Sequence, residues 1–455
     1  MKRPKKLNSI ERKSILLLVD LFIVIAALNV LVNYAIDEKF VSELLKIVVF
    51  SFGIITYLIF SYVLDFYNLE IVAKRRQILS RALYISSLFV FTVFIFLVIF
   101  FDASFWRIPL ICFLVLTPIQ IGLWRFLFTN IFRIIPTIKN VLYIYDKHSL
   151  DSLRNELNMV NGEGMNTFYK VKLTYSIDHH SLENKTFFLS AADKVDAIII
   201  NIKEYHNLSN ELENMIVSSI LKGTEVVSFM SFYESTYEAL PIKYHNESYY
   251  EILQLRNKKI RYLQQIFSFL TNLVLCLVAG VFFLLLTPVV WFLNLFLNRG
   301  PLFYSQLRVG KYGKEFKIYK FRSMIVDAEK KGAMMATKND LRITSFGKIL
   351  RMFRIDEIPQ ILSIINGDMQ FIGPRPERQI FVDKLNEITP FYNDRLLIKP
   401  GITGWAQVKY KYGENLEDSL KKLEYDLFYI KNKSITLDLR IIFKTITTVL
   451  FSRGV

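Results

Sequence analysis

Five long apolar runs constrain this chain more than any other feature of its sequence. A helix needs roughly 20 apolar residues to cross the hydrocarbon core of a bilayer, and the first four runs are long enough to do so. We expect transmembrane helices at residues 15–34, 47–64, 83–101 and 108–132. Because 22% of the 455 residues are charged, the membrane cannot hold the whole chain. The sequence therefore predicts a bundle of four transmembrane helices, within residues 1–138, joined to folded domains outside the membrane.

One carboxylate, Asp20, lies inside the first apolar run. Ionisable residues within a membrane are rare, and they mark either a functional site or a polar partner in the helix bundle. A polar partner, or a position near the membrane edge, explains Asp20 without a catalytic role. We prefer this structural interpretation.

Lys and Arg residues indicate which helix ends face the cytoplasm. They gather at the amino terminus and in the connection at residues 74–81, whereas the other two connections contain few. Because cytoplasmic loops are enriched in Lys and Arg, we expect the amino terminus and everything after the fourth helix to face the cytoplasm. The chain is thus predicted to be a multi-pass membrane protein with cytoplasmic soluble domains.

The fifth apolar run, residues 266–297, contains Thr287-Pro288 and has basic residues on both sides. Both flanks therefore favour the cytoplasm. An interior proline removes one helix hydrogen bond and bends the helix. These features predict a linker and a re-entrant, kinked helix within residues 256–298. The alternative is an ordinary fifth crossing, which would place the last third of the chain outside the cell.

Strand and helix patterns alternate in residues 139–255. Three runs read as strands, at residues 140–145, 195–201 and 224–228, and two as helices, at residues 151–158 and 208–222. This alternation predicts a small, parallel, Rossmann-like α/β domain. No Gly-x-Gly-x-x-Gly fingerprint follows its first strand, so we expect a spacer or regulatory domain that binds no dinucleotide.

The last third of the chain, residues 299–455, is basic and contains no histidine; it carries 28 Lys and Arg against 17 Asp and Glu. Its chemistry must therefore use carboxylates, Lys and Arg. The basic balance fits a phosphate-rich substrate or an anionic membrane surface. Nucleic acid is a poor candidate because this region follows membrane segments. We predict an α+β catalytic domain at the membrane surface.

An acidic pair, Asp356-Glu357, precedes Ile358-Pro359-Gln360. Pro359 fits the first turn of a helix that ends near residues 366–367. The pair would then lie at a helix amino terminus, where backbone N–H groups favour negative charge, with Arg351 and Arg354 just upstream. Such a pair is usually only a helix cap. Its neighbouring motifs favour a site for a pyrophosphate and its magnesium ion.

Three further stretches surround this pair in the sequence: Lys320-Phe321-Arg322-Ser323-Met324, Gly373-Pro374-Arg375-Pro376 and residues 399–408, which contain Gly401, Gly404 and Trp405. With residues 355–360 and the Thr287-Pro288 helix, they make five motifs in one order. Over residues 256–455 the chain closely resembles the monotopic polyprenyl phosphate phosphoglycosyl transferases, or bacterial sugar transferases, in their large multi-domain form.

The resemblance implies a reaction and its participants. Asp356 would attack the sugar-bearing phosphorus of a UDP-sugar and release UMP, while Glu357 would bind Mg²⁺. Undecaprenyl phosphate would then accept the sugar-1-phosphate, initiating exopolysaccharide, capsule or O-antigen synthesis. Such a chain would reside in a bacterial inner membrane, in contact with membrane lipids.

Seven basic side chains are expected to contact substrate phosphate groups. They are Arg308, Lys320, Arg322, Arg351, Arg354, Arg375 and Lys411. Lys411 is a departure from the family, some of whose members carry Gly-Arg after the Trp-Ala-Gln-Val stretch. A lysine there supplies a point charge in place of an arginine fork.

Two alternatives remain open. The chain could be a catalytically silent membrane scaffold of a polysaccharide assembly complex. It could also be a membrane-bound nucleotide-sugar dehydratase or epimerase, although the missing glycine fingerprint argues against that. No motif reports which sugar is transferred. Assembly as a homodimer is a further expectation.

Overall fold

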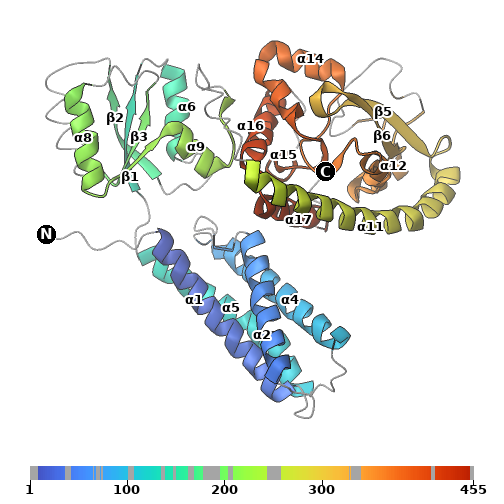
Figure 1. The fold of residues 1–455 in the computed structure, drawn as a ribbon, viewed down its shortest axis with the longest axis horizontal. Helices are drawn as coiled ribbons and strands as arrows, with labels where there is room; N and C mark the ends of the chain where they lie inside the picture. Colours follow the sequence, from blue (N-terminus) through green and yellow to red (C-terminus); the bar gives the residue numbers. More distant parts are fainter. Residues whose placement is uncertain are drawn as a thin grey trace. The chain divides into compact units, whose positions relative to one another are not determined.

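The computed structural model describes most of the chain, and it divides into two compact units, residues 1–229 and 230–455 (Figure 1). Each unit is described by itself. The described residues are 9–35, 43–64, 66–67, 72, 75–100, 107–134, 139–146, 150–161, 169–177, 195–202, 209–242, 258–326, 328, 340–410 and 416–450.

Four helices pack side by side at the start of the chain, as the first four apolar runs predict (Figure 1). They are α1 (Ser9–Val30), α2 (Glu43–Val63), α4 (Arg75–Phe100) and α5 (Arg107–Ile134). One buried apolar cluster, which includes Leu28, Tyr57 and Phe89, holds them together. Other large apolar side chains point outward: Leu18 is 65% exposed and Phe22 74% exposed. An apolar exterior of this kind suits contact with lipid.

Four described helices are long and apolar enough to cross a membrane, which fits a membrane protein. Their apolar spans are Arg12–Asn33, Ile78–Ile99, Ile111–Ile131 and Gln264–Leu297. The apolar stretch of α2, Lys46–Tyr62, is shorter than the others. The second predicted crossing is therefore a helix with a shorter apolar stretch than we expected, whereas the fifth apolar run is long enough to cross.

A four-stranded parallel sheet with strand order β2-β1-β3-β4 follows the bundle. Its strands are β1 (Lys139–Tyr145), β2 (Tyr169–Ser176), β3 (Ala197–Asn201) and β4 (Glu225–Ser228), with helices α6 (Leu150–Asn161) and α8 (Asn210–Leu221). All predicted strands and helices of this region are present. The sequence analysis missed β2, which is an edge strand whose side chains alternate between partly buried and exposed.

The second unit begins within α9 (Phe229–Tyr237) and contains a long helix, α11 (Lys258–Leu297). An antiparallel hairpin of β5 (Phe303–Val309) and β6 (Glu315–Phe321) follows. The remaining elements are α12 (Ser345–Met352), a 3₁₀ helix η6 (Ile355–Gln360), α13 (Ile361–Ile365), β7 (Gln370–Ile372), α14 (Gln379–Ile388), η7 (Pro390–Leu397), β8 (Gly401–Thr403), α15 (Trp405–Lys409), α16 (Leu416–Asn432) and α17 (Ile435–Leu450).

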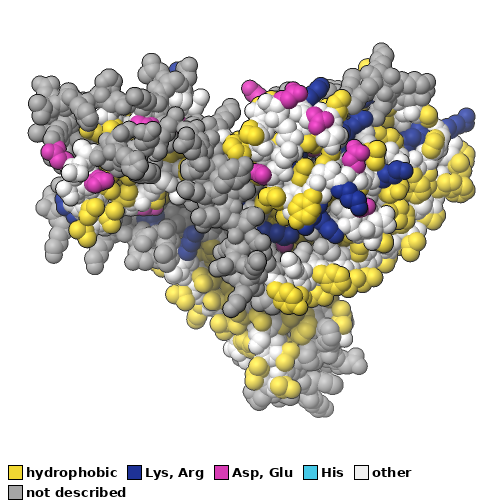
Figure 2. All heavy atoms as spheres, turned by 45° about the horizontal axis from the view of Figure 1, so that its top comes forward, with side chains coloured by type: hydrophobic (Ala, Val, Ile, Leu, Met, Phe, Trp, Pro, Cys, Tyr) yellow, Lys and Arg dark blue, Asp and Glu magenta, His cyan; other side chains and the backbone are white. Residues whose placement is uncertain are grey.

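Helix α11 presents exposed apolar side chains along its length, and Figure 2 shows yellow side chains along this edge of the second unit, with Lys and Arg on the neighbouring face. Pro288 lies inside the helix. The hydroxyl of Thr287 donates a 2.6 Å hydrogen bond to the carbonyl of Phe283, and in Figure 1 the ribbon curves in its last turns. A helix with a proline bends where the hydrogen-bond ladder is interrupted.

Side-chain amides tie α11 to the rest of the second unit. The Asn272 side-chain oxygen accepts a 2.7 Å hydrogen bond from the backbone N–H of Phe371 in β7. At the other end of the helix, Asn298 donates to the carbonyl of Arg322 at 2.8 Å. Helix α11 is thus hydrogen-bonded to β7 and to the residue that follows β6, so it is part of the folded second unit.

Candidate active site

The acidic pair lies in the first turn of η6, immediately after α12. Arg354, the residue before this helix, has φ of 57° and ψ of 20°, a left-handed conformation that is uncommon for a residue with a side chain. Asp356 and Glu357 are 6% and 7% exposed. Pro359 lies inside η6, two residues before α13, and not in the first turn of a longer helix as the sequence suggested. Left-handed backbone such as that of Arg354 is strained, and strained backbone concentrates at functional sites.

Three cations surround the carboxylate of Glu357. Its Oε1 lies 2.7 Å from Nη2 of Arg375 and 3.4 Å from Nζ of Lys320, and its Oε2 lies 3.4 Å from Nη1 of Arg354. Burial alone would raise the pKa of Glu357, but these cations together hold that pKa well below its usual range. Glu357 is therefore an anion that is fixed in place.

Asp356 differs from its neighbour in both its contacts and its acidity. Within the described part of the chain, no hydrogen bond or ion pair engages its carboxylate. Burial and the charge of Glu357 raise the pKa of Asp356, and Lys320, Arg351 and Arg375 oppose that rise. A carboxylate that is buried, close to cations and bonded to none of them is available to react.

The cations come from separate elements. Lys320 is on β6, and burial is the largest cause of the lowering of its pKa. Arg351 is in the last turn of α12, and its Nε donates a 2.9 Å hydrogen bond to Ser323. Arg375 follows β7. Four residues predicted to contact phosphate, Lys320, Arg351, Arg354 and Arg375, thus gather around the acidic pair.

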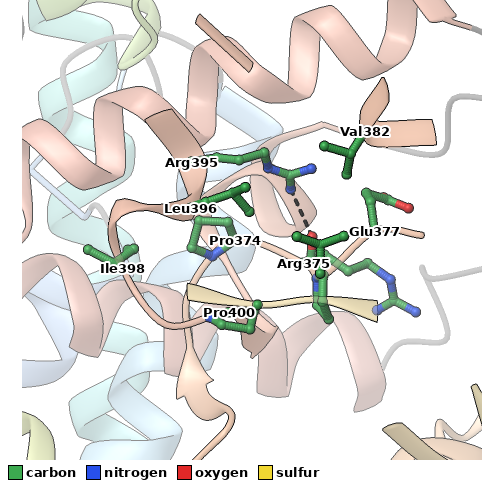
Figure 3. Close-up of a pocket in the computed structure, with 11 residues that line it drawn as sticks. Pro374, Arg375, Glu377, Val382, Arg395, Leu396, Ile398 and Pro400 are labelled. Atoms are coloured by element: carbon green, nitrogen blue, oxygen red, sulfur yellow. Dashed lines mark hydrogen bonds between the residues drawn. The ribbon is translucent and has the colours of Figure 1, made fainter. Parts of the chain in front are cut away.

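The loop that carries Arg375 is built on a close approach of two glycines. Strands β7 and β8 pair in parallel, and a Cβ atom added at Gly401 would lie 2.1 Å from the backbone nitrogen of Gly373. Nη2 of Arg395 donates a 2.8 Å hydrogen bond to the carbonyl of Arg375 (Figure 3). The same Nη2 lies 2.8 Å from Oδ2 of buried Asp426. These contacts fix the backbone from which Arg375 reaches Glu357.

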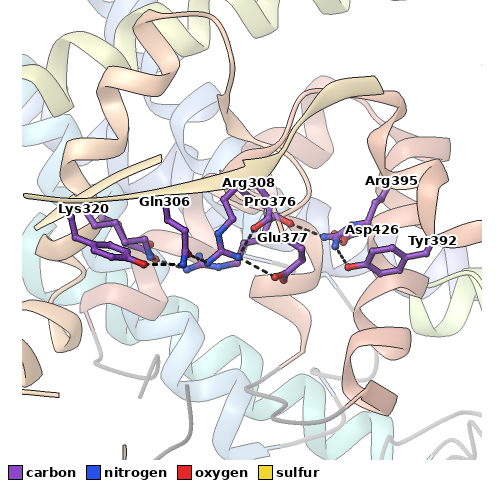
Figure 4. Close-up of polar contacts among 11 residues, drawn as sticks. Gln306, Arg308, Lys320, Pro376, Glu377, Tyr392, Arg395 and Asp426 are labelled. Carbon is purple, nitrogen blue, oxygen red and sulfur yellow. Dashed lines mark hydrogen bonds and ion pairs between the residues drawn. The ribbon is translucent and has the colours of Figure 1, made fainter. Parts of the chain in front are cut away.

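Arg308 supports the other side of this loop (Figure 4). Its Nη1 lies 3.3 Å from both Glu377 Oε2 and the Pro376 carbonyl, and its Nη2 donates to Gln306 at 2.8 Å. The adjoining pocket in Figure 3 is small and mostly apolar in its walls, and neither Asp356 nor Glu357 lines it. Arg308 is thus tied to the loop, and its predicted phosphate contact stays a prediction.

Two other predicted phosphate contacts have different outcomes. Arg322 is 8% exposed, and its guanidinium donates to the backbone carbonyls of three residues, which are Asn298, Pro301 and Met324. Arg322 therefore joins the end of α11 to the β5–β6 hairpin, and within the described residues it forms no ion pair with Asp356 or Glu357. Lys411 lies outside the described residues.

The sequence analysis missed Arg395 and Asp426. Arg395 is 7% exposed and Asp426 2% exposed, in η7 and α16. Asp426 lies between two residues with buried side chains, Tyr425 and Leu427, and a buried carboxylate needs a partner. That pattern could have identified Asp426, but not its partner.

The donor atoms at the site limit how a metal ion could bind. No group of three or more His, Cys, Asp and Glu side chains gathers within the described residues. Mg²⁺ usually binds through one or two carboxylates, with substrate phosphate oxygens and water completing its shell. Asp356 and Glu357 offer two carboxylates, so the residues present fit Mg²⁺ that arrives with a phosphorylated substrate.

Comparison with known proteins places these motifs in a family. A family model described as bacterial sugar transferase matches residues 263–452. A Bacillus subtilis protein named uncharacterized sugar transferase EpsL is 38% identical over 183 residues, which are 39% of this chain and 87% of the relative. The chain belongs to the bacterial sugar transferase family. The resemblance that the motifs predicted is therefore confirmed.

Two further relatives carry names that state an activity. An Aeromonas hydrophila UDP-N-acetylgalactosamine-undecaprenyl-phosphate N-acetylgalactosaminephosphotransferase is 48% identical over 155 residues, 34% of this chain. A Klebsiella pneumoniae UDP-glucose:undecaprenyl-phosphate glucose-1-phosphate transferase is 39% identical over 178 residues, 39% of this chain. In both cases the match spans 37% of the relative's length.

Proposed function

We propose that this protein transfers a sugar-1-phosphate from a UDP-sugar to undecaprenyl phosphate. The observation that carries the proposal is the buried pair Asp356-Glu357 among four cations. The cations can neutralise the oxygens of a diphosphate while a carboxylate attacks its phosphorus. The named activities of the Aeromonas and Klebsiella relatives support this reaction class.

The reaction proceeds in two displacements in this proposal. An oxygen of Asp356 attacks the phosphorus that bears the sugar; an aspartyl–phosphorus bond forms, and the bond to the leaving UMP breaks with its electron pair. A phosphate oxygen of undecaprenyl phosphate then attacks the same phosphorus and releases Asp356 as a carboxylate. No histidine base is needed because an ionised carboxylate is already a nucleophile.

Glu357 and Asp356 have different roles in this proposal. Because Arg375, Lys320 and Arg354 hold it as an anion, it keeps these cations in place until a diphosphate enters. Bound Mg²⁺ would supply charge neutralisation on the diphosphate. Glu357 is the residue we propose as its ligand.

A lipid acceptor requires a site at the membrane surface. We propose that α11 is a re-entrant helix bent near Thr287-Pro288, and that residues 299–455 form the catalytic domain on the cytoplasmic side of a bacterial inner membrane. Basic residues on both flanks of the helix support that orientation. The α/β domain, Rossmann-like in this proposal, serves as a spacer or regulatory domain, and the bundle can assemble as a homodimer.

The donor sugar is the least constrained part of the proposal. Two relatives named for N-acetylgalactosamine are 48% and 53% identical to this chain, whereas relatives named for glucose are 37–45% identical. UDP-N-acetylgalactosamine is therefore the first donor to test, ahead of UDP-glucose and UDP-galactose.

The deciding experiment follows UMP release by the purified full-length protein with Mg²⁺, undecaprenyl phosphate and each UDP-sugar. We expect release with one donor, its abolition in Asp356→Asn, and its retention in Asp383→Asn, an exposed carboxylate on α14 that serves as the control. No release with any donor would favour a scaffold.

A second assay tests the covalent route. Donor labelled in the sugar-proximal phosphate is added without acceptor, and the denatured protein is examined for retained label. Wild type should retain label and Asp356→Asn should not. UMP release without retained label would reject the aspartyl intermediate and leave the transfer reaction standing.

A further inference from the structure

The helix that precedes the acidic pair leaves large apolar side chains exposed. On α12, Ile349 is 49% exposed and Met352 39% exposed, and Phe353, the residue that caps the helix, is 49% exposed. Residues three and four apart lie on one side of a helix, so these three side chains form a continuous strip, which we call the α12 edge. Adjoining exposed apolar side chains mark surfaces that bind a partner or a lipid.

The buried side of α12 joins the apolar helix α11 to the acidic pair. Leu350 of α12 shares a buried apolar cluster with Val290 of α11, which lies two residues after Pro288. Ile355 and Ile358, the residues on either side of the acidic pair, pack against the same cluster. The acidic pair and α12 therefore lie beside α11 near its proline.

The outer side of α11 is apolar and exposed at this level. Trp291 and Phe292 follow Val290 in the sequence, and they are 52% and 57% exposed. Lys348, four residues before Met352 and on the same side of α12, is exposed as well. A lysine at the border of an apolar surface is typical of the membrane interface, where its stem lies on apolar groups and its ammonium group remains in water. A lipid in the membrane can therefore reach the α12 edge.

The end of α12 is close to the acidic pair in space as well as in sequence. Burial raises the pKa of Asp356, and the charge of Arg351 in the last turn of α12 opposes that rise. Phe353 is three residues before Asp356, so their Cα atoms are at most about 11 Å apart. Nη1 of Arg354, the next residue, lies 3.4 Å from Oε2 of Glu357. Apolar, cationic and carboxylate groups thus follow one another over a short distance.

This order matches the parts of a polyprenyl phosphate. In the second displacement, an oxygen of the acceptor phosphate must reach the phosphorus bound to Asp356. The chain attached to that phosphate therefore has to leave the site over a surface close to the acidic pair. The α12 edge is an apolar surface within this distance, and Arg354 supplies a cation for the phosphate. A long apolar chain gains free energy by covering such a surface.

We propose that the α12 edge binds the first isoprene units of the polyprenyl phosphate acceptor. This inference rests on the proposed transfer reaction, and it adds the surface by which the site selects a lipid acceptor. A water-soluble phosphate monoester has no chain to place on the α12 edge, and binding of the UDP-sugar does not involve it.

Photo-crosslinking tests the contact directly. A polyprenyl phosphate with a diazirine in its first isoprene unit is irradiated with the full-length protein in detergent, without donor, and labelled peptides are mapped by mass spectrometry. We expect label on residues 349–353 that excess undecaprenyl phosphate removes and excess phosphatidylglycerol does not. Equal removal by both lipids would make the α12 edge a general membrane contact, and label only elsewhere would place the chain on another surface. Either result overturns the proposal.

The crosslinking requires no sugar transfer, so its outcome is separate from that of the proposed function. A protein that carries the label but releases no UMP binds the acceptor without the proposed activity. A protein that releases UMP but carries no label at residues 349–353 has the activity without this contact.

Substitutions measure how much the α12 edge contributes. Ile349→Ser and Phe353→Ser should each raise the KM for undecaprenyl phosphate by about ten-fold, because each removes an apolar side chain from the contact, and should leave the KM for the UDP-sugar unchanged. Phe353→Leu, which keeps an apolar side chain, should recover most of the loss. Ile380→Ser is the matched control, because Ile380 on α14 is 48% exposed, and its acceptor KM should not change. An unchanged acceptor KM in both edge variants would contradict the contact, and an equal rise in the donor KM would mean that α12 only supports the fold of the site.

Discussion

Arg395 donates a hydrogen bond to the backbone carbonyl of Arg375, and the side chain of Arg375 lies 2.7 Å from Glu357. Asp426 holds the same guanidinium at 2.8 Å. A chain of contacts therefore runs from the buried helix α16 to the acidic pair. Arg395 touches neither carboxylate of that pair, so it acts through the loop that presents Arg375.

The Arg395 guanidinium also donates a hydrogen bond to the hydroxyl of Tyr392. Arg395→Lys should lower UMP release by at least about ten-fold, because a single ammonium group cannot replace a planar guanidinium that bonds to Arg375, Asp426 and Tyr392. Initial rates at several donor concentrations measure the effect. Arg440→Lys, which alters another ion pair of the same unit, with Glu238, is the control. Equal losses of activity in the two variants would assign the effect to general stability and remove the positioning role.

The backbone at Arg354 yields a second prediction. Its left-handed conformation costs a glycine nothing and costs a β-branched residue about 1–2 kcal/mol. Arg354→Gly should therefore keep the unfolding midpoint and lose activity, since one cation near Glu357 is gone. Arg354→Val should lose activity and also lower the midpoint by several degrees, as measured by thermal unfolding in detergent. Identical midpoints for the two variants would show that the conformation is not strained.

The paired glycines of β7 and β8 yield a third prediction. A methyl group at Gly401 would overlap the backbone of Gly373, which cannot move aside without shifting the Arg375 loop. Gly401→Ala should abolish UMP release or prevent folding. Gly280→Ala, where the added Cβ would make an ordinary 3.7 Å contact with Ile361, should retain both fold and activity. An active Gly401→Ala protein would mean that the loop does not need this close approach.

Local pattern predicted much of the fold. Hydropathy located α1, α2, α4, α5 and α11, and alternation located three of the four strands of the parallel sheet. The edge strand β2 was not predicted because its exposed lysines interrupt the apolar pattern. The boundary between the two compact units follows Phe229, where no change in composition marks it in the sequence.

The candidate site shows where sequence reasoning stops. Charge and motif position identified Asp356, Glu357 and the cations that gather around them. They also suggested that Arg322 contacts phosphate, whereas its guanidinium is occupied by three backbone carbonyls. A basic residue in a motif can bind substrate or fix the chain, and only its tertiary partners distinguish the two. Arg395 and Asp426 were missed for the same reason, because 31 residues separate them.

Glu238 gives a pH-dependent prediction. Burial would raise its pKa, but Lys409 and Arg440 together hold the pKa below its usual value. A carboxyl group whose pKa is lowered by folding contributes stability above its unfolded pKa of about 4.3, and that contribution is lost as the pH falls. Glu238→Gln should therefore lower the unfolding midpoint at pH 7, and the difference from wild type should begin to shrink at about pH 4.3 and shrink further as the pH falls through the lowered pKa of Glu238. Thermal unfolding across this range, with Glu315→Gln at an exposed position as the control, measures it. A difference that stays constant from pH 7 to well below about pH 4.3 would mean that Glu238 stabilises the unit through packing and not through its charge.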